Sequence, residues 1–429
     1  MANQSAVKSI FDHDEFKPYR GRYAARRERA MRRRRYYEGT IYDDGQFKIA
    51  HKLYAQTKSL FSLLARAVDL DVALVPGMAA PWELKEGTPQ VITKAQGLLY
   101  EWSSWDTEGE EWLEDGATTG EAALKIVPDA DARLVRLQRL RPEIALLLDS
   151  HWDAETGQRI PLGLIVDPQA EDADGTGYEY AEAITPAGIR TYRDGAPWGY
   201  SGNPDRYPNP LGFVPIVWAK NDSECRPTFA KAQPQLNSVN ELASYLADII
   251  GRHAEPQWAA SGVEEGEMVK SGDNVWFLPA GASVEAILAT VDIEGTLAFI
   301  REVKEETKAN LPELAFDDLR AKDQIATETL EVQLVELDAK IWKMRRRYDA
   351  ALTEAHRMAA TAAAITGIGE LSPLLQMHQF DFARPVRPVS RFDQIRLEEA
   401  ELALEAQRSI FGGERLTATA GVMSEIVRA

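Results

Sequence analysis

Three kinds of side chain in this sequence could do chemistry: clustered carboxylates, six histidines and one cysteine. The acidic clusters are Glu108, Glu110, Glu111 and Glu114, and then Asp317 and Asp318. A two-metal nuclease needs acidic ligands that converge from different elements, and spacing along a sequence does not show convergence. Because a chain with 67 Asp and Glu residues forms clusters by chance, we predict that these carboxylates form a solvated surface.

The other residue types give no second route to catalysis. The histidines are His13, His51, His151, His253, His356 and His378, and none is paired at the i+3 or i+4 spacing of a helical metal site. The patterns of a Walker phosphate loop, G-x-G-x-x-G and G-x-S-x-G do not occur. The single cysteine, Cys225, allows neither an intrachain disulfide nor a cysteine zinc site. We therefore predict no catalytic residue, no cofactor and no metal, and we expect that the chain is not an enzyme.

Charge is spread unevenly over the 429 residues. The net charge is −18, yet residues 1–60 hold fourteen Lys and Arg against seven Asp and Glu. A chain with this much negative charge should not bind DNA tightly, because phosphate binding depends on concentrated cations. It can still surround DNA that must move. The most apolar stretch, Leu60 to Val75, is interrupted by three charged residues and is too short to span a bilayer. We expect a soluble protein with no membrane partner.

The secondary-structure elements that position these side chains are, in the first hundred residues, mostly helices. Residues 17–38 predict a basic helix that stops at Gly39, with its charge either solvated or in contact with DNA or an acidic neighbour. Residues 51–75 predict a second helix that leads into a strand, and residues 88–105 predict a third. The length and the 45% hydrophobic fraction together indicate two to four structural units with a sizeable core.

Residues 110–220 predict a mainly antiparallel β region. Two apolar runs within residues 122–137 flank a Pro-Asp-Ala-Asp turn, which predicts a hairpin. Short strands are expected at 160–166 and 178–192. A loop rich in Gly, Pro and Asn follows at 194–210, and a buried strand runs from Gly212 to Trp218.

Helical periodicity returns in the second half of the chain. It predicts a helix from Gln233 to Pro256 and another from Ile293 to Asn310, with a short strand at 274–278 between them. The strongest pattern is the apolar stripe Leu330, Leu334, Leu337, Ile341, Met344, Tyr348 and Leu352. Its opposite face carries Glu331, Glu336, Asp338, Lys340 and Arg346. About 40 residues at ~1.5 Å each give a helix of roughly 60 Å, which suits packing along a large assembly.

The order of these elements and a set of short motifs resemble the portal proteins of tailed double-stranded-DNA bacteriophages, in the branch typical of phages with long non-contractile tails. The motifs are Tyr36-Tyr37-Glu38-Gly39, Thr119-Gly120-Glu121-Ala122, Gly212-Phe213-Val214-Pro215-Ile216-Val217 with Asn221, Gln235-Leu236-Asn237, Leu246-Ala247-Asp248-Ile249 with Pro256, and Thr327-Glu328-Thr329-Leu330. Each motif is unspecific alone, but the ordered set covers roughly residues 30–410.

The resemblance implies an α+β portal fold with a β-rich and α wing, a two-helix stem, a small α/β clip, a long wing helix and a helical crown. Its parts are the wing 1–230, the first stem helix 231–252, the clip 253–291, the second stem helix 292–310, the tunnel loop 311–324, the long wing helix 325–384 and the crown 385–429, with a helix from Phe392 to Phe411. In this scheme the tunnel-loop residues that face DNA are Phe316, Asp317, Asp318, Arg320 and Lys322. The clip residues that dock partners are Trp258, Val275, Trp276 and Phe277.

The same resemblance implies a ring, usually of twelve subunits, at one vertex of the capsid in the virion, assembled in the host cytoplasm. Double-stranded DNA would pass through it during packaging and ejection. Its other partners would be the terminase large subunit, the head–tail adaptor and the major capsid or scaffold protein. Two alternatives stay open. The basic arm and the acidic clusters would also fit a DNA-processing packaging enzyme such as a nuclease, and a minor capsid or scaffold protein would be more helical and lack a β-rich wing.

Overall fold

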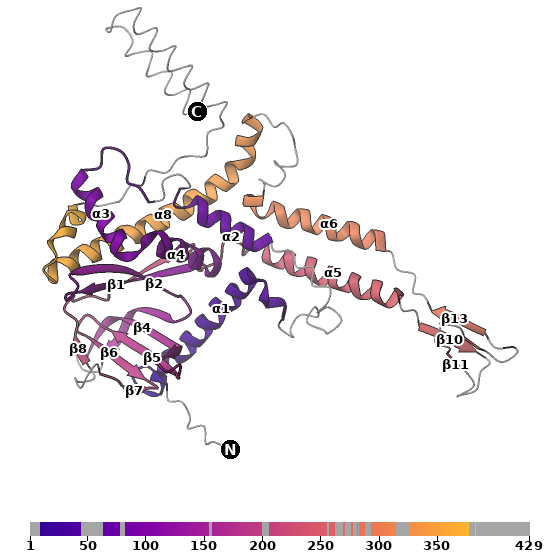
Figure 1. Ribbon diagram of the computed structural model, residues 1–429, viewed down its shortest axis with the longest axis horizontal. Coiled ribbons are helices and arrows are strands. Elements are labelled where there is room, and N and C mark those ends of the chain that lie inside the picture. The colour runs from indigo at the N-terminus through magenta and orange to yellow at the C-terminus, as the bar shows by residue number, and fades with distance from the viewer. Residues whose placement is uncertain are drawn as a thin grey trace, which may run out of the picture. The chain divides into compact units, whose positions relative to one another are not determined.

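Helices and antiparallel sheets alternate along the chain, as the computed structural model shows (Figure 1). It describes residues 9–43, 63–77, 82–153, 157–199, 206–254, 257–261, 269–270, 276–277, 281, 283–287, 293–314, 327–376 and 382. The mixture of helix and sheet confirms the predicted α+β class. By its contacts the chain divides into two units, residues 1–76 with 84–382 and residues 77–83 with 383–429. Nearly all of the second unit lies outside the described residues, and every element named below belongs to the first.

The elements have the following bounds. The α-helices are α1 (Arg20–Glu38), α2 (Leu63–Leu74), α3 (Gln90–Ser103), α4 (Trp105–Thr119), α5 (Gln233–Ala254), α6 (Ile293–Ala309) and α8 (Thr327–Ile365). The 3-10 helices are η1 (Ile10–Asp12), η2 (Lys17–Tyr19), η3 (Thr40–Asp43), η7 (Pro312–Leu314) and η8 (Gly369–Gln376). The strands are β1 (Glu121–Asp129), β2 (Leu134–Leu140), β3 (Ala145–Asp153), β4 (Gln158–Glu171), β5 (Gly177–Ile184), β6 (Gly188–Arg193), β7 (Ala196–Pro197), β8 (Arg206–Pro208), β9 (Ile216–Lys220), β10 (Gln257–Ser261), β11 (Val269–Lys270), β12 (Trp276–Phe277) and β13 (Ser283–Ile287).

Two antiparallel sheets form the centre of the first unit. Strands β2, β1 and β9 make one sheet, and β3 to β7 make the other in sequence order, with β8 paired to β6. A shared apolar core joins the sheets, because Ala123 and Ile216 from the first pack with Ile165 and Ile184 from the second. Helices α4 and α8 cover the first sheet (Figure 1). The N-terminal segment packs on the second sheet, where Phe16 and neighbouring aromatic residues meet the apolar side chains of β3 and β4.

Most of the predicted elements are confirmed. Gly39 ends α1 with φ +74°, a left-handed conformation that glycine adopts without strain. The predicted hairpin is β1 with β2, the helices predicted near 233–256 and 293–310 are α5 and α6, and the long amphipathic pattern is the 39-residue α8. The residues 51–62 and the helix predicted from Phe392 to Phe411 lie outside the described residues.

Three predictions are wrong in detail. The described part of the second helix, α2, runs into a turn at Val75 and not into a strand, and the run 178–192 is two strands with a turn between them. The strand predicted from Gly212 begins only at Ile216. Gly212 itself has φ +72°, a left-handed conformation outside the range of a strand, so the strand cannot begin there.

The helix α4 was not predicted, since residues 110–119 were assigned to the β region. Glycine at 109 and 116 lowers helix propensity, and this hides a buried stripe that repeats every three or four residues. Tertiary packing explains both glycines. A side chain at Gly109 would press on the Trp105 ring, and one at Gly116 would overlap the Tyr348 hydroxyl. Close packing of α4 against its own tryptophan and against α8 therefore outweighs the weak local preference.

Candidate functional site

The helices α5 and α6 lie side by side and pack on each other through one thin apolar seam (Figure 1). Val239 and Leu246 of α5 meet Ile300 of α6, and all three are buried. Two flanking residues, Leu242 and Val303, are only partly buried. Three of the periodic apolar residues that predicted α5, namely Val239, Leu242 and Leu246, therefore lie in this contact.

Short antiparallel strands lie between these two helices in the sequence. Trp258 stands opposite Ala286 where β10 pairs with β13, and Trp276 stands opposite Lys270 where β12 pairs with β11. The predicted partner-docking residues Trp258, Trp276 and Phe277 are thus on strands, whereas Val275 lies outside the described residues. The two hairpin-like pairs agree with a small β module inserted between two helices.

The predicted DNA-facing residues Phe316, Asp317, Asp318, Arg320 and Lys322 all lie outside the described residues. The segment that leads into them is described and firmly held. Leu311, Glu313 and Leu314 are buried directly after α6. The first residues of the predicted tunnel loop, 311–324, are therefore anchored in the protein core. Three charged side chains form this anchor.

This anchor, which we call the buried charge cluster, consists of Asp71, Glu313 and Lys340. The Lys340 ammonium lies 3.0 Å from Asp71 Oδ2 and also donates to Glu313 Oε1. Both carboxylates are fully buried. The buried charge cluster joins α2, η7 and α8. Asp71, which is far away in the sequence, therefore helps to fix the chain where it leaves α6. Lys340 was predicted on the face of the long helix opposite the apolar stripe, and that prediction is wrong because two buried acids hold it inward.

The charges in this cluster do not balance, because two acids face one base. Burial raises the pKa of Asp71 to about 8, with Lys340 acting against the rise and Glu313 adding to it. Burial disfavours the charged form of Lys340, but both carboxylates favour it more strongly, and its pKa lies above its usual range. Near neutral pH Asp71 is thus mostly protonated beside the Lys340 cation.

The long helix α8 is fixed by polar contacts as well as by its apolar stripe. Tyr348 is fully buried, donates a hydrogen bond of 2.8 Å to Asn221 Oδ1, and meets the Trp112 ring edge to face at 5.0 Å. Asn221, one of the motif residues, also donates to the Gly116 carbonyl. Arg345 donates to the carbonyls of Leu74 and Val75 at the end of α2, which satisfies groups that a helix end leaves without internal partners.

The basic helix α1 has two kinds of arginine. Arg26 lies over the Trp218 ring and pairs with Glu121 at 2.8 Å, and Arg33 donates to the Thr119 and Cys225 carbonyls. These side chains hold α1 to the sheet and are not available to DNA. Other members of the helix, Arg22, Arg29 and Arg32, are exposed. The alternative of a solvated face or an external contact therefore applies to this second group alone.

The acidic cluster that began at Glu108 keeps a solvated part, since Glu110 is exposed and the Glu111 side chain is 46% exposed, but its neighbour Asp115 belongs to an internal network. Asp115 is fully buried and accepts from Arg34 at 2.6 Å and from Arg139 at 2.6 and 2.8 Å. Glu111 also pairs with Arg139, and Glu108 accepts from its backbone amide. Sequence spacing did not reveal this network, because its arginines come from α1 and β2.

Among the residues that the structure describes, no group of three or more His, Cys, Asp or Glu is arranged to hold a metal ion. Cys225 is half-buried, and burial raises the pKa of its thiol, which lowers its reactivity. His356 is fully buried, and burial lowers its pKa to about 4, so it is neutral. In the described part of the chain, no helix is apolar and long enough to cross a bilayer.

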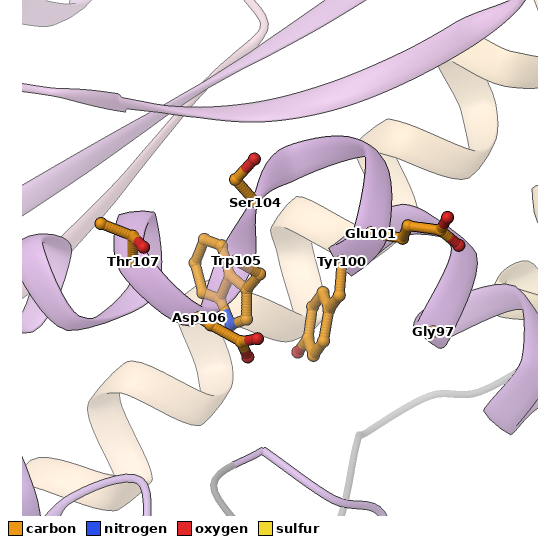
Figure 2. Close-up of a pocket in the computed structure, with 7 residues that line it drawn as sticks. All are labelled: Gly97, Tyr100, Glu101, Ser104, Trp105, Asp106 and Thr107. Atoms are coloured by element: carbon orange, nitrogen blue, oxygen red, sulfur yellow. The ribbon is translucent and has the colours of Figure 1, made fainter.

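A pocket of about 460 Å³ lies at the junction of α3 and α4 (Figure 2). The Tyr100 and Trp105 rings stack at 5.4 Å and point the same way from the turn at Ser104, which has φ +48°. The remaining labelled side chains, among them Glu101 and Asp106, belong to the same turn. The two carboxylates that line it, Glu101 and Asp106, belong to one short segment, so the pocket lacks the converging groups of a catalytic site.

A comparison with models of protein families identifies the family of this chain. The chain matches the family described as "Phage portal protein, SPP1 Gp6-like" over residues 17–367. It belongs to this phage portal family. The match spans the basic helix, both sheets, α5, α6 and all of α8, and it confirms the resemblance that the ordered motifs gave.

Solved structures similar to this portal-family chain come from phage-like particles. One is described as "Neck of empty GTA particle computed with C6 symmetry". It is 14% identical, with 84% of this chain and 90% of that chain covered and a TM-score of 0.42. Another, "Virion of native gene transfer agent (GTA) particle", is 15% identical, with 81% and 86% covered and a TM-score of 0.35. The search of curated proteins found no match.

Proposed function

We propose that copies of this chain assemble into a ring at one capsid vertex, and that double-stranded DNA passes through the ring during packaging and ejection. The observation that carries the proposal is the portal-family match over residues 17–367. In this scheme the wing is 1–230, α5 and α6 are the stem, 253–291 is the clip, 311–324 is the tunnel loop, 325–384 is the long wing helix and 385–429 is the crown.

The charge of the chain supports a conduit. DNA must slide through the ring, and a wall rich in cations would hold phosphates and slow it. The chain has a net charge of −18, and part of its basic helix is bound internally through Arg26, Arg33 and Arg34. Isolated cations such as Arg320 and Lys322 would then contact the passing backbone without holding it.

The clip would carry the partners. We propose that Trp258, Val275, Trp276 and Phe277 dock the terminase large subunit during packaging and the head–tail adaptor afterwards. The wing and crown would face the major capsid or scaffold protein. The ring would assemble in the host cytoplasm and remain in the virion, and twelve subunits is the number we expect.

Negative-stain microscopy and mass photometry of the purified full chain test the proposal. We expect rings with a central hole, and we expect neither cleavage of plasmid DNA with Mg²⁺ or Mn²⁺ nor turnover of ATP. Deletion of residues 317–321 should leave the ring intact and impair packaging or DNA retention in an assembly assay. A chain that stays a single subunit at every concentration, or that cleaves DNA, would contradict the proposal.

A further inference from the structure

The side of α8 that faces away from its own core carries an exposed apolar face. Val335 and Trp342 are 59% and 57% exposed, and Ala339 between them is exposed as well. Arg346 continues the same face one turn later, since the spacing of three or four residues keeps these positions aligned. We call residues 335, 339, 342 and 346 the α8 outer face. Two large apolar side chains so far out of the core mark a contact site.

The helices α5 and α6 present a matching hollow. A groove of about 480 Å³ lies between them, and its residues are Pro234, Gln235, Ser238, Glu241, Leu242, Phe299 and Val303. Phe299 is 52% exposed and forms part of its apolar wall. A groove of this volume, with an aromatic ring at its side, is suited to a large apolar side chain.

Within one subunit these two features do not cover each other, because Trp342 and Phe299 are both more than half exposed. They also differ in form, one being a protruding ring and the other a groove. A protruding feature and a hollow on the same chain fit a heterologous contact, in which each subunit uses one feature toward one neighbour and the other feature toward the next. Such contacts close into a ring when the rotation allows it.

The charges nearest Trp342 and the groove are opposite, and the exposed Glu336 lies at the other end of the α8 outer face, beside Val335. Arg346 lies on the α8 outer face, and Lys343, also exposed, lies beside Trp342. In the groove Glu241 is a lining residue, and Glu302 and Glu306 share the face of α6 that carries Phe299, as their spacing of three and seven residues requires. Cations beside the protruding ring and carboxylates beside the groove favour this pairing and disfavour contact between two like faces.

The inner side of α8 makes the outer face rigid. Met344 and Tyr348 are buried in the core, and Lys340 is held by the buried charge cluster. The Arg345 guanidinium lies 6.0 Å from the Trp342 ring centre, while the same group donates to the end of α2. A preorganised aromatic side chain on a fixed helix loses little conformational freedom on binding, as the strong contacts of interfaces require.

We propose that the α8 outer face of one subunit docks in the α5–α6 groove of a second copy of this chain. Trp342 enters the groove against Phe299, and Arg346 and Lys343 meet Glu241, Glu302 and Glu306. The inference rests on the proposed ring and names the surface that closes it. Trp342 is 57% exposed in the single subunit, so its burial in the groove would remove roughly half or more of the ~150–250 Å² that an aromatic residue can bury.

Cross-linking of the full chain tests the contact. Cys225→Ser removes the native thiol, Ala339→Cys places a thiol on the α8 outer face, and Ser238→Cys places one in the groove. On oxidation, we expect the subunit with both new thiols to give a ladder of covalent multimers, and an equal mixture of the two single variants to stop at dimers. A link between two Ala339→Cys subunits alone would overturn the inference, since it would mean like faces meet.

Substitutions give a second readout. Trp342→Ala and Phe299→Ala should each raise the subunit concentration needed for assembly by about tenfold or more, the effect of losing a central aromatic contact. Trp152→Ala is the matched control, since Trp152 is 59% exposed on β3 and outside the proposed contact. Thermal melting of the dissociated subunit should not change in any of the three. A lowered melting temperature for Trp342→Ala would mean that the chain's own residues cover this face, which would overturn the inference.

These experiments distinguish a wrong docking surface from a wrong assignment of the ring. Rings that form normally with Trp342→Ala, and that give no ladder from the double-cysteine subunit, would overturn the docking surface and leave the ring. Absence of any ring from the unaltered chain would overturn the proposed function and the docking surface with it.

Discussion

The layer of α4 and α8 on the first sheet and the α5–α6 pair are stabilised in contrasting ways. In the layer, Trp105, Trp112 and Tyr348 are completely buried, and Asp115 is bound by two arginines. The α5–α6 pair has a seam of three buried residues, and Phe299 remains more than half exposed. On its inner side, the layer satisfies its apolar and charged groups within one subunit. We infer that the α5–α6 pair gains much of its stability from neighbouring copies.

The largest expected effect is in the layer. Asp115→Ala leaves Arg34 and Arg139 without the buried carboxylate that they share, and removing one partner of a buried pair costs about 3–5 kcal/mol. Urea unfolding of the dissociated subunit measures the loss. Glu110→Ala, an exposed acidic residue on the same helix, is the control and should change stability by less than about 0.5 kcal/mol. Equal effects would mean that the arginines find other partners.

The buried charge cluster should make stability depend on pH. The pKa of Asp71 is about 8 in the folded chain and near 3.8 in the unfolded chain, so the folded state binds this proton more tightly. The contribution is complete below about pH 4 and is lost as the pH rises to about 8, at up to about 1.4 kcal/mol per pH unit. Asp71→Asn cannot lose a proton, and its stability should lack this fall between pH 6 and 8.

Unfolding curves at pH 6, 7 and 8 check this prediction. Asp69→Asn is the matched control because Asp69 is exposed on the same helix, and that variant should keep the pH dependence of the unaltered chain. A full pH dependence in Asp71→Asn would assign it to other groups.

A smaller effect should follow from one hydroxyl. Tyr348→Phe removes the donor to Asn221 Oδ1 and leaves that buried acceptor unsatisfied, which costs about 1–3 kcal/mol. Tyr37→Phe, which removes an exposed hydrogen bond to Asp69, should cost less than about 0.5 kcal/mol. Thermal melting compares the two. If Tyr37→Phe proved the more costly, the burial of the Tyr348 hydroxyl would not be what stabilises α8.

The smallest effect on the fold is expected in the α5–α6 pair. Phe299→Ala removes an exposed ring and should change the unfolding free energy of a dissociated subunit by less than about 0.5 kcal/mol. Ile300→Ala, its buried neighbour, should cost more, since it opens the seam with Val239 and Leu246. Hydrogen exchange at α5 and α6 separates the two variants. Similar exchange in both would mean that the seam adds little within one subunit.

Periodicity in the sequence predicted the elements that bury a regular stripe. The helices α5, α6 and α8 each repeat apolar residues at three or four positions, and the β1–β2 hairpin has an apolar run on each side of a turn. Periodicity failed at α4, where Gly109 and Gly116 weaken the local preference for helix. What makes those glycines necessary is the Trp105 ring and the Tyr348 hydroxyl, and Tyr348 is more than two hundred residues away in the sequence.

By itself, the sequence determined the class of fold, the long helices, the family and the absence of known catalytic motifs, because these depend on composition and on patterns within short segments. Only the tertiary structure decided which charges are internal. The helical pattern placed Lys340 opposite the apolar stripe, and Asp115 lay beside an acidic cluster that was predicted to be solvated. Both are bound by partners from distant segments. The physical reason is that the environment of a charge depends on which elements fold against it, and no spacing along the chain records that contact.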